Sequence, residues 1–256
     1  LHREHAADLA RLDPPVQVRL ALEELGPTFV KLGQILAGRA DLFGPEWIAE
    51  FGKLHSRVPA VPIETLRAQL REDLGAEPEA VFARFDAEPL AAASIAQVHR
   101  AQLADGTEVV VKIRRPGIRE VIEADLRLLD RVAAVADQDW PALKPYRPRQ
   151  LVREFARSLR RELDFAAECR HAERIAANLA ALPEVVIPRV HWAYTGERVN
   201  VQDYIDGIPG EDLERITREG LEKLRALLVK QERADPDRIA GLRPNRALVL
   251  PGGLAI

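Results

Sequence analysis

The chain is unusual in how it uses lysine. It holds 37 lysine and arginine residues, and only six of these are lysines. Arginine therefore supplies most of the positive charge, and a lysine inside an apolar run needs its own explanation. Lys112 lies in such a run, between Val111 and Ile113. A lysine fixed on a strand can grip phosphate oxygens when a carboxylate partner positions it. The competing interpretation is an ordinary solvated strand face.

Acidic residues on a charged helical stretch, residues 149–182, are the candidate partners of this lysine. Asp164 and Glu168 are four residues apart and share one helix face, while Glu162 lies well around the helix from both. We expect Glu168 to pair with Lys112, which leaves Glu162 and Asp164 for other partners. The alternative is a solvated acidic face that neighbouring arginines neutralise.

Two further segments carry groups suited to contacting a phosphate or one of these acids. Small residues at 91–94 would let backbone N–H groups approach phosphate oxygens, although a helix that starts with an alanine run is a strong alternative. Lys31 and Gln34 are spaced i,i+3 on an otherwise apolar helix. We expect both side chains to point toward a cleft and to approach Glu162 or Asp164. A lysine that snorkels at the helix edge is the alternative.

The composition excludes several classes of protein. The formal net charge of -3 and the pI of about 6.1 argue against nucleic-acid binding. The one cysteine, Cys169, rules out a disulfide framework and fits a reducing compartment, and the six histidines lack metal-ligand spacing. No apolar run reaches the ~20 residues of a membrane span, so we expect a cytoplasmic protein. The absence of methionine indicates a fragment, a processed chain or an edited sequence.

Periodicity along the chain predicts an α+β fold, with helices grouped around a locally paired antiparallel sheet. Helical spacing predicts helices over residues 16–25, 27–36, 63–74, 78–85, 118–137 and 212–230, and over 149–182 with one break. Period-two stretches predict a hairpin of strands 95–103 and 108–114 around an Asp-Gly turn. They also predict strands over 185–190 and 198–205.

The order of these motifs resembles that of the UbiB family, atypical kinases of the ADCK type that are linked to ubiquinone biosynthesis. Lys31-Leu32-Gly33-Gln34 looks like the family's KxGQ motif, and residues 91–99 resemble the alanine-rich loop that replaces the glycine-rich loop of kinases. Val110-Val111-Lys112 resembles the lysine strand. Glu162-Leu163-Asp164 resembles the ExD motif, with Glu168 as the glutamate of the following helix.

The resemblance implies a protein-kinase-like fold with three parts. These are a helical N-terminal extension (residues 1–85), an N-lobe with an antiparallel sheet (86–206) and a truncated C-lobe (207–256). It also implies that ATP or ADP binds together with Mg²⁺, and that Lys112 holds the phosphates while paired with Glu168. The other residues it places at the nucleotide are Ala91, Ala92, Ala93, Ser94, Gln202 as gatekeeper, and Asp203, Tyr204 and Ile205 as hinge.

By the same resemblance, Lys31, Gln34, Glu162 and Asp164 belong to a cover over the site where a protein substrate would enter. The implied activity is therefore ATP hydrolysis or phosphorylation of a small molecule in support of quinone synthesis, not phosphorylation of proteins. The implied partners are an adenine nucleotide, a quinone-precursor lipid and the surface of the inner membrane. The alternative is a catalytically inactive module that binds a nucleotide or a lipid.

The tail departs from the family's pattern. Asp235 would be the catalytic-loop aspartate and Asn245 the metal-binding asparagine, but seven extra residues, 237–243, disturb their spacing. The sequence ends at Ile256, before the position of the family's D-F-G segment, so the resemblance implies an incomplete C-terminal lobe. We expect weak or metal-independent nucleotide binding and negligible turnover from such a chain.

Overall fold

The computed structural model describes residues 12–54, 59–182, 185–207 and 217–218. The chain divides into two compact units, residues 1–204 and residues 205–255. The first unit contains all the elements described below. Apart from Thr217 and Arg218, the expected helix over 212–230 lies outside the described residues, as do Asp235 and Asn245.

Among the described residues, the first part of the N-terminal extension contains three short helices: α2 (Pro14–Leu25), α3 (Pro27–Leu36) and α4 (Pro45–Phe51). Each begins with a proline, whose fixed φ suits the first helical turn and which has no N–H to leave unpaired. Gly26 joins α2 to α3 at a φ of 100°, which side chains disfavour. The three helices share a core of Leu22, Phe29, Val30, Phe51 and Leu54. The helices predicted over 16–25 and 27–36 are confirmed.

Two further helices, α5 and α6, pack against the sheet. Helix α5 (Ile63–Leu74) ends at Gly75, which adopts the left-handed conformation of a helix C-cap. Helix α6 (Pro78–Val81) follows after a short turn. The helix expected over 78–85 is too long, because the chain becomes extended from Arg84 onward and enters the first strand.

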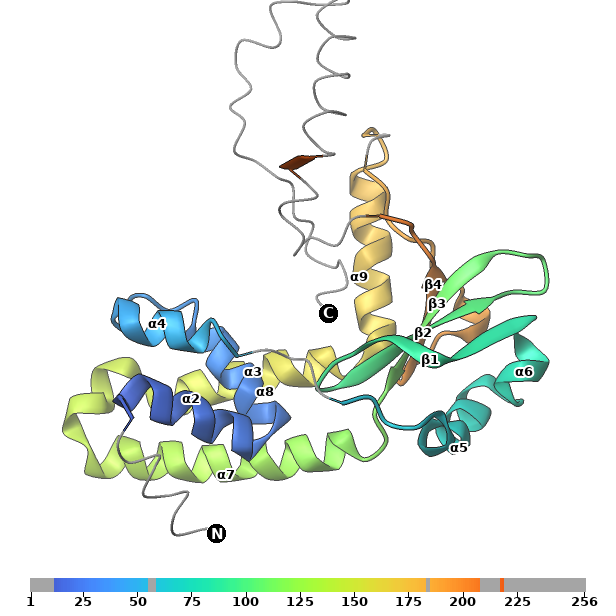
Figure 1. Cartoon of the computed structure of the whole chain (residues 1–256). Helices are drawn as coiled ribbons and strands as arrows, with labels where there is room; N and C mark the ends of the chain where they lie inside the picture. The colour runs from blue at the N-terminus through green and yellow to red at the C-terminus, as the bar shows by residue number, and fades with distance from the viewer. Residues whose placement is uncertain (1–11, 55–58, 183–184, 208–216, 219–256) are drawn as a thin grey trace, which may run out of the picture. The chain divides into compact units, whose positions relative to one another are not determined.

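The sheet has four antiparallel strands in chain order: β1 (Arg84–Ala92), β2 (Ala96–Gln102), β3 (Glu108–Arg114) and β4 (Val199–Asp203) (Figure 1). The β2–β3 hairpin confirms the prediction, with Gly106 of its turn at a φ of 87°. The strand expected over 198–205 is also present, in slightly shorter form. The strand expected over 185–190 is wrong, since that segment forms only an isolated bridge between Val190 and Gln202.

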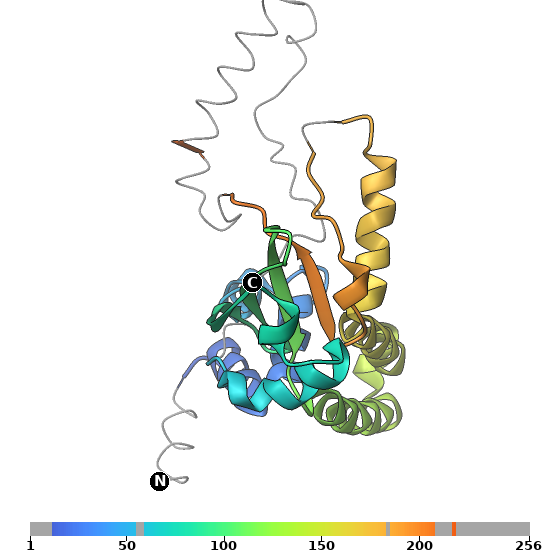
Figure 2. The same ribbon diagram turned by 90° about the vertical axis from the view of Figure 1, so that its right-hand side faces the viewer.

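The two faces of the sheet have different neighbours. On one face, Val109, Val111 and Ile113 of β3 and the valines of β4 are fully buried against α5 and α6. Lys112 points to the opposite face, since successive side chains of a strand alternate. Figure 2 shows helix α9 (Phe165–Asn178) beside β4. The lysine therefore lies between the sheet and this helix.

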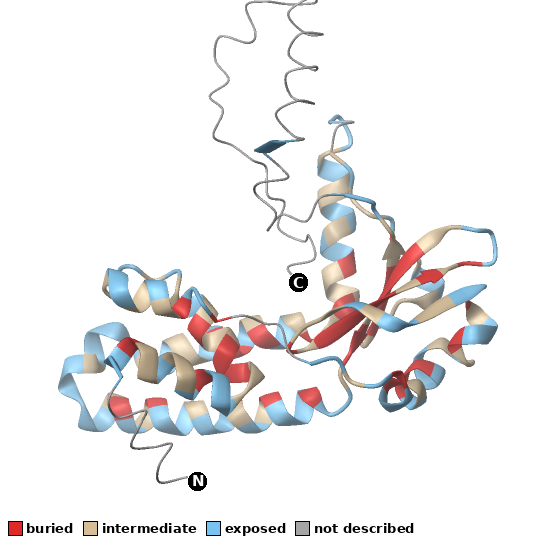
Figure 3. Ribbon diagram, viewed as in Figure 1, coloured by how far each residue is buried: buried red, intermediate tan, exposed pale blue. Residues whose placement is uncertain are grey.

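Two long helices connect the sheet to α9. Helix α7 (Ile118–Asp139) and helix α8 (Pro148–Glu162) lie side by side around a shared apolar core, and a 3₁₀ turn over Pro141–Tyr146 joins them. Buried residues line the inner faces of both helices (Figure 3). The predicted break within 149–182 is confirmed at Leu163 and Asp164, where α8 ends and α9 begins.

Candidate functional site

The predicted ion pair between Lys112 and Glu168 is present. The Nζ atom of Lys112 lies 2.9 Å and 3.1 Å from the two carboxylate oxygens of Glu168. The same ammonium group lies 4.5 Å from the centre of the Phe165 ring, which gives it a cation–π contact. Phe165 and Glu168 are three residues apart on α9, so one helix face supplies both contacts. The two side chains are therefore paired with each other, although both remain partly exposed.

This ion pair positions the lysine more than it stabilises the fold. The two side chains retain 27% and 36% of their exposure, and a partly exposed pair contributes about 1 kcal/mol or less to stability. A lysine whose side chain is held in place yet partly exposed can still bind an anionic ligand.

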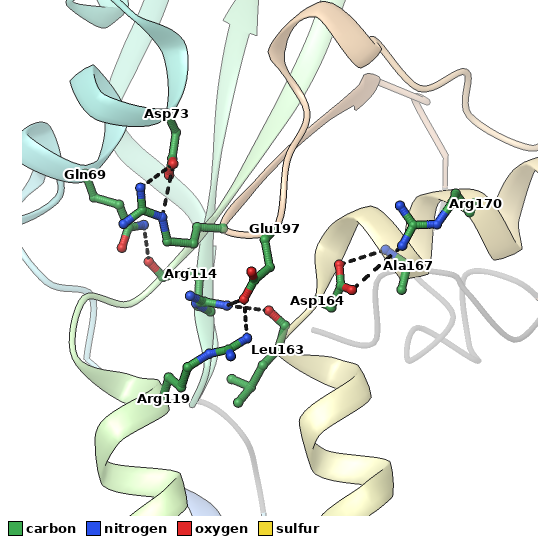
Figure 4. Close-up of polar contacts among 10 residues, drawn as sticks. Gln69, Asp73, Arg114, Arg119, Leu163, Asp164, Ala167, Arg170 and Glu197 are labelled. Atoms are coloured by element: carbon green, nitrogen blue, oxygen red, sulfur yellow. Dashed lines mark hydrogen bonds and ion pairs between the residues drawn. The ribbon is translucent and has the colours of Figure 1, made fainter.

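Helix α9 is held at its N-terminus by Asp164. The Oδ1 atom of Asp164 accepts a hydrogen bond from the backbone N–H of Ala167 at 2.9 Å, which is the geometry of a helix N-cap. Its other oxygen lies 3.7 Å from the guanidinium of Arg170 (Figure 4). The Phe165 N–H donates to the carbonyl of Glu197 at 3.1 Å. These contacts fix the first turn of α9, from which Glu168 reaches Lys112.

Arg114, which the sequence analysis did not single out, anchors the break between α8 and α9. Its buried guanidinium donates to the Leu163 carbonyl at 2.6 Å and to the Glu197 carboxylate at 3.0 Å (Figure 4). Gln69 of α5 donates to the Arg114 carbonyl at 2.8 Å. The sequence signal that could have found it is its position two residues after Lys112 on the same strand face, which brings it to the break just before α9.

A row of paired residues crosses the sheet at the level of the lysine. Ala91 pairs with Val98, Val98 with Lys112, and Lys112 with Asn200. Because paired residues of antiparallel strands project from the same face, the four side chains form one floor. Asn200 is buried, and its Oδ1 has no hydrogen-bond partner among the described residues. This floor therefore carries the ammonium group of Lys112 and the buried side-chain oxygen of Asn200.

The alanine-rich segment forms the tip of the β1–β2 hairpin. Ala91 and Ala92 end β1, and the Ala93 N–H donates to the Ala96 carbonyl at 2.8 Å to close the turn. Ser94 is buried, and Arg115 donates to the Ala93 carbonyl at 2.9 Å. The alternative of a helix start is wrong, since the run is extended. Its contact with phosphates stays a prediction.

The expected gatekeeper and hinge lie on β4 and just beyond it. Gln202 approaches the sulfur of Cys169 on α9, at 3.7 Å. Burial raises the pKa of the Cys169 thiol to about 11, so it stays protonated at neutral pH. Asp203 lies 2.7 Å from Nε2 of His191, and the Tyr204 N–H donates to the Glu108 carbonyl. Ile205 begins the second unit and is exposed. The roles of these residues at a nucleotide stay predictions.

The N-terminal extension reaches the same region through a second ion pair. Lys31 Nζ lies 2.9 Å from Oε1 of Glu162, which confirms the predicted approach. Gln34 Nε2 donates to the Leu54 carbonyl at 3.2 Å, so its approach to the two acids stays a prediction. Between them, Gly33 packs tightly against its neighbours, because a Cβ there would force the side chains of Leu54 and Leu22 to shift. The KxGQ-like segment therefore joins an ion pair to a close helix contact.

The described part of the chain shows neither a metal cluster nor a membrane span. No group of three or more histidine, cysteine, aspartate or glutamate side chains there is arranged to hold a metal ion. Among those same residues, no helix is both long enough and apolar enough to cross a membrane.

Comparison with known proteins decides the family. Residues 53–231, more than half of the chain, match the ABC1 atypical kinase-like domain. The chain belongs to this family. Its relatives include proteins named "Probable protein kinase UbiB". The one from Marinobacter nauticus is 39% identical over 214 residues, covering 84% of this chain and 39% of that protein. The one from Pseudomonas aeruginosa PAO1 is 40% identical over 200 residues, covering 78% and 38%.

A solved structure supports the kinase-like fold of this ABC1-family chain. The complex of Rv3197 with erythromycin from Mycobacterium tuberculosis matches with a TM-score of 0.51 and 28% sequence identity, covering 72% of this chain and 45% of that one. The chain thus spans about two fifths of the length of the curated relatives above. The predicted membership of the UbiB family of atypical kinases and the predicted α+β, kinase-like fold are confirmed.

Proposed function

We propose that this chain forms the nucleotide-binding lobe of a UbiB-type ATPase or small-molecule kinase, and that ATP or ADP binds on the sheet face at Lys112. The observation that carries the proposal is the Lys112–Glu168 ion pair. It holds an accessible ammonium group on the same strand-and-helix frame that kinases use to grip phosphates.

The residues around Lys112 have separate tasks in this proposal. Lys112 attracts the phosphate oxygens, while Glu168 and Phe165 keep its side chain extended over the sheet. The small residues of the 91–94 turn allow the β1–β2 hairpin to approach the phosphates closely.

The described residues do not form a magnesium site on their own. Magnesium needs oxygen ligands that are open to it, and the three nearby carboxylates are engaged. Glu168 pairs with Lys112, Glu162 pairs with Lys31, and Asp164 caps α9. We therefore assign no step to a metal, and the expected ligand Asn245 lies outside the described residues.

The Lys31–Glu162 pair supports a small-molecule reaction over protein phosphorylation. It ties α3 of the N-terminal extension to the end of α8, one residue before the break that leads into α9. An extension tied there would occupy the approach that a protein substrate needs. By the relation to the UbiB proteins, the proposed role is in quinone synthesis, with a quinone-precursor lipid as the candidate acceptor.

Titration of the chain with a fluorescent ATP analogue tests the proposal. We expect Lys112→Ala and Glu168→Gln to weaken binding at least tenfold, because the first removes the charge and the second removes its positioning partner. Lys144→Ala is the matched control and should leave binding unchanged. Equal affinity in Lys112→Ala and the wild-type chain would refute the proposal. Tight binding without phosphate release would instead favour the inactive nucleotide-binding alternative.

A further inference from the structure

Helix α8 carries a second concentration of positive charge, separate from Lys112. A cavity of about 460 Å³ lies where α8 meets the start of α9, and we call it the arginine hollow. Its lining residues are Arg153, Arg157, Arg160, Arg161, Asp164 and Ala167. Neither Lys112, Glu168 nor the β1–β2 turn lines it, so it is not the proposed nucleotide site.

Most of the charge in the arginine hollow is uncompensated. Arg160 makes a bidentate ion pair with Glu123 of α7, in which two guanidinium nitrogens lie 2.7 Å and 2.8 Å from the two carboxylate oxygens. The carboxylate of Asp164 is engaged by the Ala167 N–H and by Arg170. Within the described part of the chain, Arg153, Arg157 and Arg161 have neither an ion pair nor a hydrogen bond from their side chains. Three guanidinium groups thus face the hollow without an internal counter-charge.

This arrangement works against the stability of the helix. Arg153, Arg157 and Arg161 are spaced i,i+4, so they stack along one face, where like charges repel. Several arginines elsewhere do have a counter-charge: Arg19, Arg67 and Arg198 each pair with carboxylates. An ordinary solvated row of basic residues lies on a convex surface. Here the unpaired arginines line the arginine hollow, and the first turn of α9 forms its other side.

We propose that the arginine hollow binds a small soluble anion with two or more phosphate groups. A guanidinium group offers two parallel N–H donors that match two phosphate oxygens. A ligand with one carboxylate could bind only one of the three arginines in this way. An anion with several phosphate oxygens can engage all three unpaired arginines at once. It also relieves their mutual repulsion, and Asp164 does not oppose it because its charge is already offset by Arg170.

Calorimetric titration of this chain with inorganic pyrophosphate at low ionic strength tests the proposal. We expect the double substitution Arg153→Gln with Arg157→Gln to weaken pyrophosphate binding at least tenfold. The matched control is Arg127→Gln with Arg131→Gln, which removes the same charge from exposed positions of α7 and should leave binding unchanged. Lys112→Ala should also leave it unchanged. Circular dichroism would establish that each variant is folded, and Arg157→Gln alone would replace a double variant that is not.

Three results would overturn the proposal. Equal weakening in both double variants would show that only bulk charge matters. Loss of binding in Lys112→Ala would place pyrophosphate in the nucleotide site. A third arm compares sedimentation with vesicles of neutral phosphatidylcholine and with vesicles containing phosphatidic acid. If the α8 double variant lost binding to the acidic vesicles while pyrophosphate gave no heat with the wild-type chain, the ligand would be a membrane headgroup and not a soluble anion.

Discussion

At the scale of single residues, the site depends on how one ammonium group is held. Lys112 contacts a carboxylate and an aromatic ring, and both belong to the first turn of α9. The sequence could predict Glu168 because it follows the ExD-like motif at the place of the helix glutamate of the UbiB family; helical spacing alone put Asp164 on the same face. It could not predict the Phe165 contact or the buried Asn200, because both depend on how close α9 and β4 come to the lysine.

The chemistry of Cys169 offers a test of the packing behind the lysine. Cys169 is buried next to Gln202, and burial raises its pKa from the ordinary 9.0 to about 11. Only the thiolate reacts with iodoacetamide, so we expect the native chain at pH 8 to react at least tenfold more slowly than the urea-unfolded chain. Mass spectrometry of the labelled peptide measures both rates. Equal rates would mean that α9 does not cover this thiol against the sheet.

At the scale of elements, the positions of α8 and α9 depend on buried polar contacts between segments far apart in sequence. Periodicity predicted both helices, the β2–β3 hairpin and β4, since each has a strong local pattern. It missed β1, because this edge strand contains Pro89, has shifts in register and lacks a regular alternation of buried residues. It wrongly placed a strand over 185–190. The apolar content of this segment favours a strand, but it does not supply the pairing partner that a strand needs.

Arg114 should be a large contributor to the stability of this arrangement. Its buried guanidinium bonds to Leu163 and Glu197, so Arg114→Ala removes charged hydrogen bonds and leaves an acceptor unsatisfied. We expect a loss of about 2–4 kcal/mol in the free energy of unfolding. Arg119→Ala removes an exposed partner of the same Glu197 and should cost less than about 1 kcal/mol. Urea denaturation compares the two, and similar losses would contradict this role for Arg114.

Gly33 should be required for the contact between α3 and its neighbours. An added methyl group would meet the buried side chains of Leu54 and Leu22. We expect Gly33→Ala to lower the free energy of unfolding by about 1–3 kcal/mol, the usual cost of overpacking. Gly38→Ala is the control, because its added methyl group would make only an ordinary contact. Thermal unfolding of both variants measures the difference, and a Gly33→Ala chain as stable as Gly38→Ala would contradict it.

At the scale of the first unit, polar links between described residues join the N-terminal extension to the α7–α8 pair. Thr28 donates to Asp125 of α7 at 2.6 Å, and Lys31 pairs with Glu162 of α8. The sequence predicted the second link from the ExD-like motif. It gave no indication of the first, because a buried threonine has no periodic signature. Both links keep the KxGQ-like segment near the start of α9.

Removing the Lys31 link should change nucleotide binding without unfolding the chain. The pair is partly exposed, so its loss should cost about 1 kcal/mol or less in stability. We expect Lys31→Ala to shift the affinity ratio between ATP and ADP at least threefold, because the extension would no longer be fixed at α8. Lys53→Ala serves as control, because among the described residues Lys53 pairs with Glu50 of the same extension. If both variants kept the wild-type ratio, the extension would have no influence on the site.

The central claim is that the phosphates of a nucleotide contact Lys112. An acyl-phosphate derivative of ATP transfers its acyl group to a lysine that contacts the phosphates, and the chain has only six lysines to compare. Peptide mass spectrometry identifies which of them is modified. We predict dominant acylation of Lys112, suppressed by excess ATP and unaffected by Lys144→Ala. Acylation spread evenly over the lysines, or insensitive to ATP at Lys112, would contradict the claim.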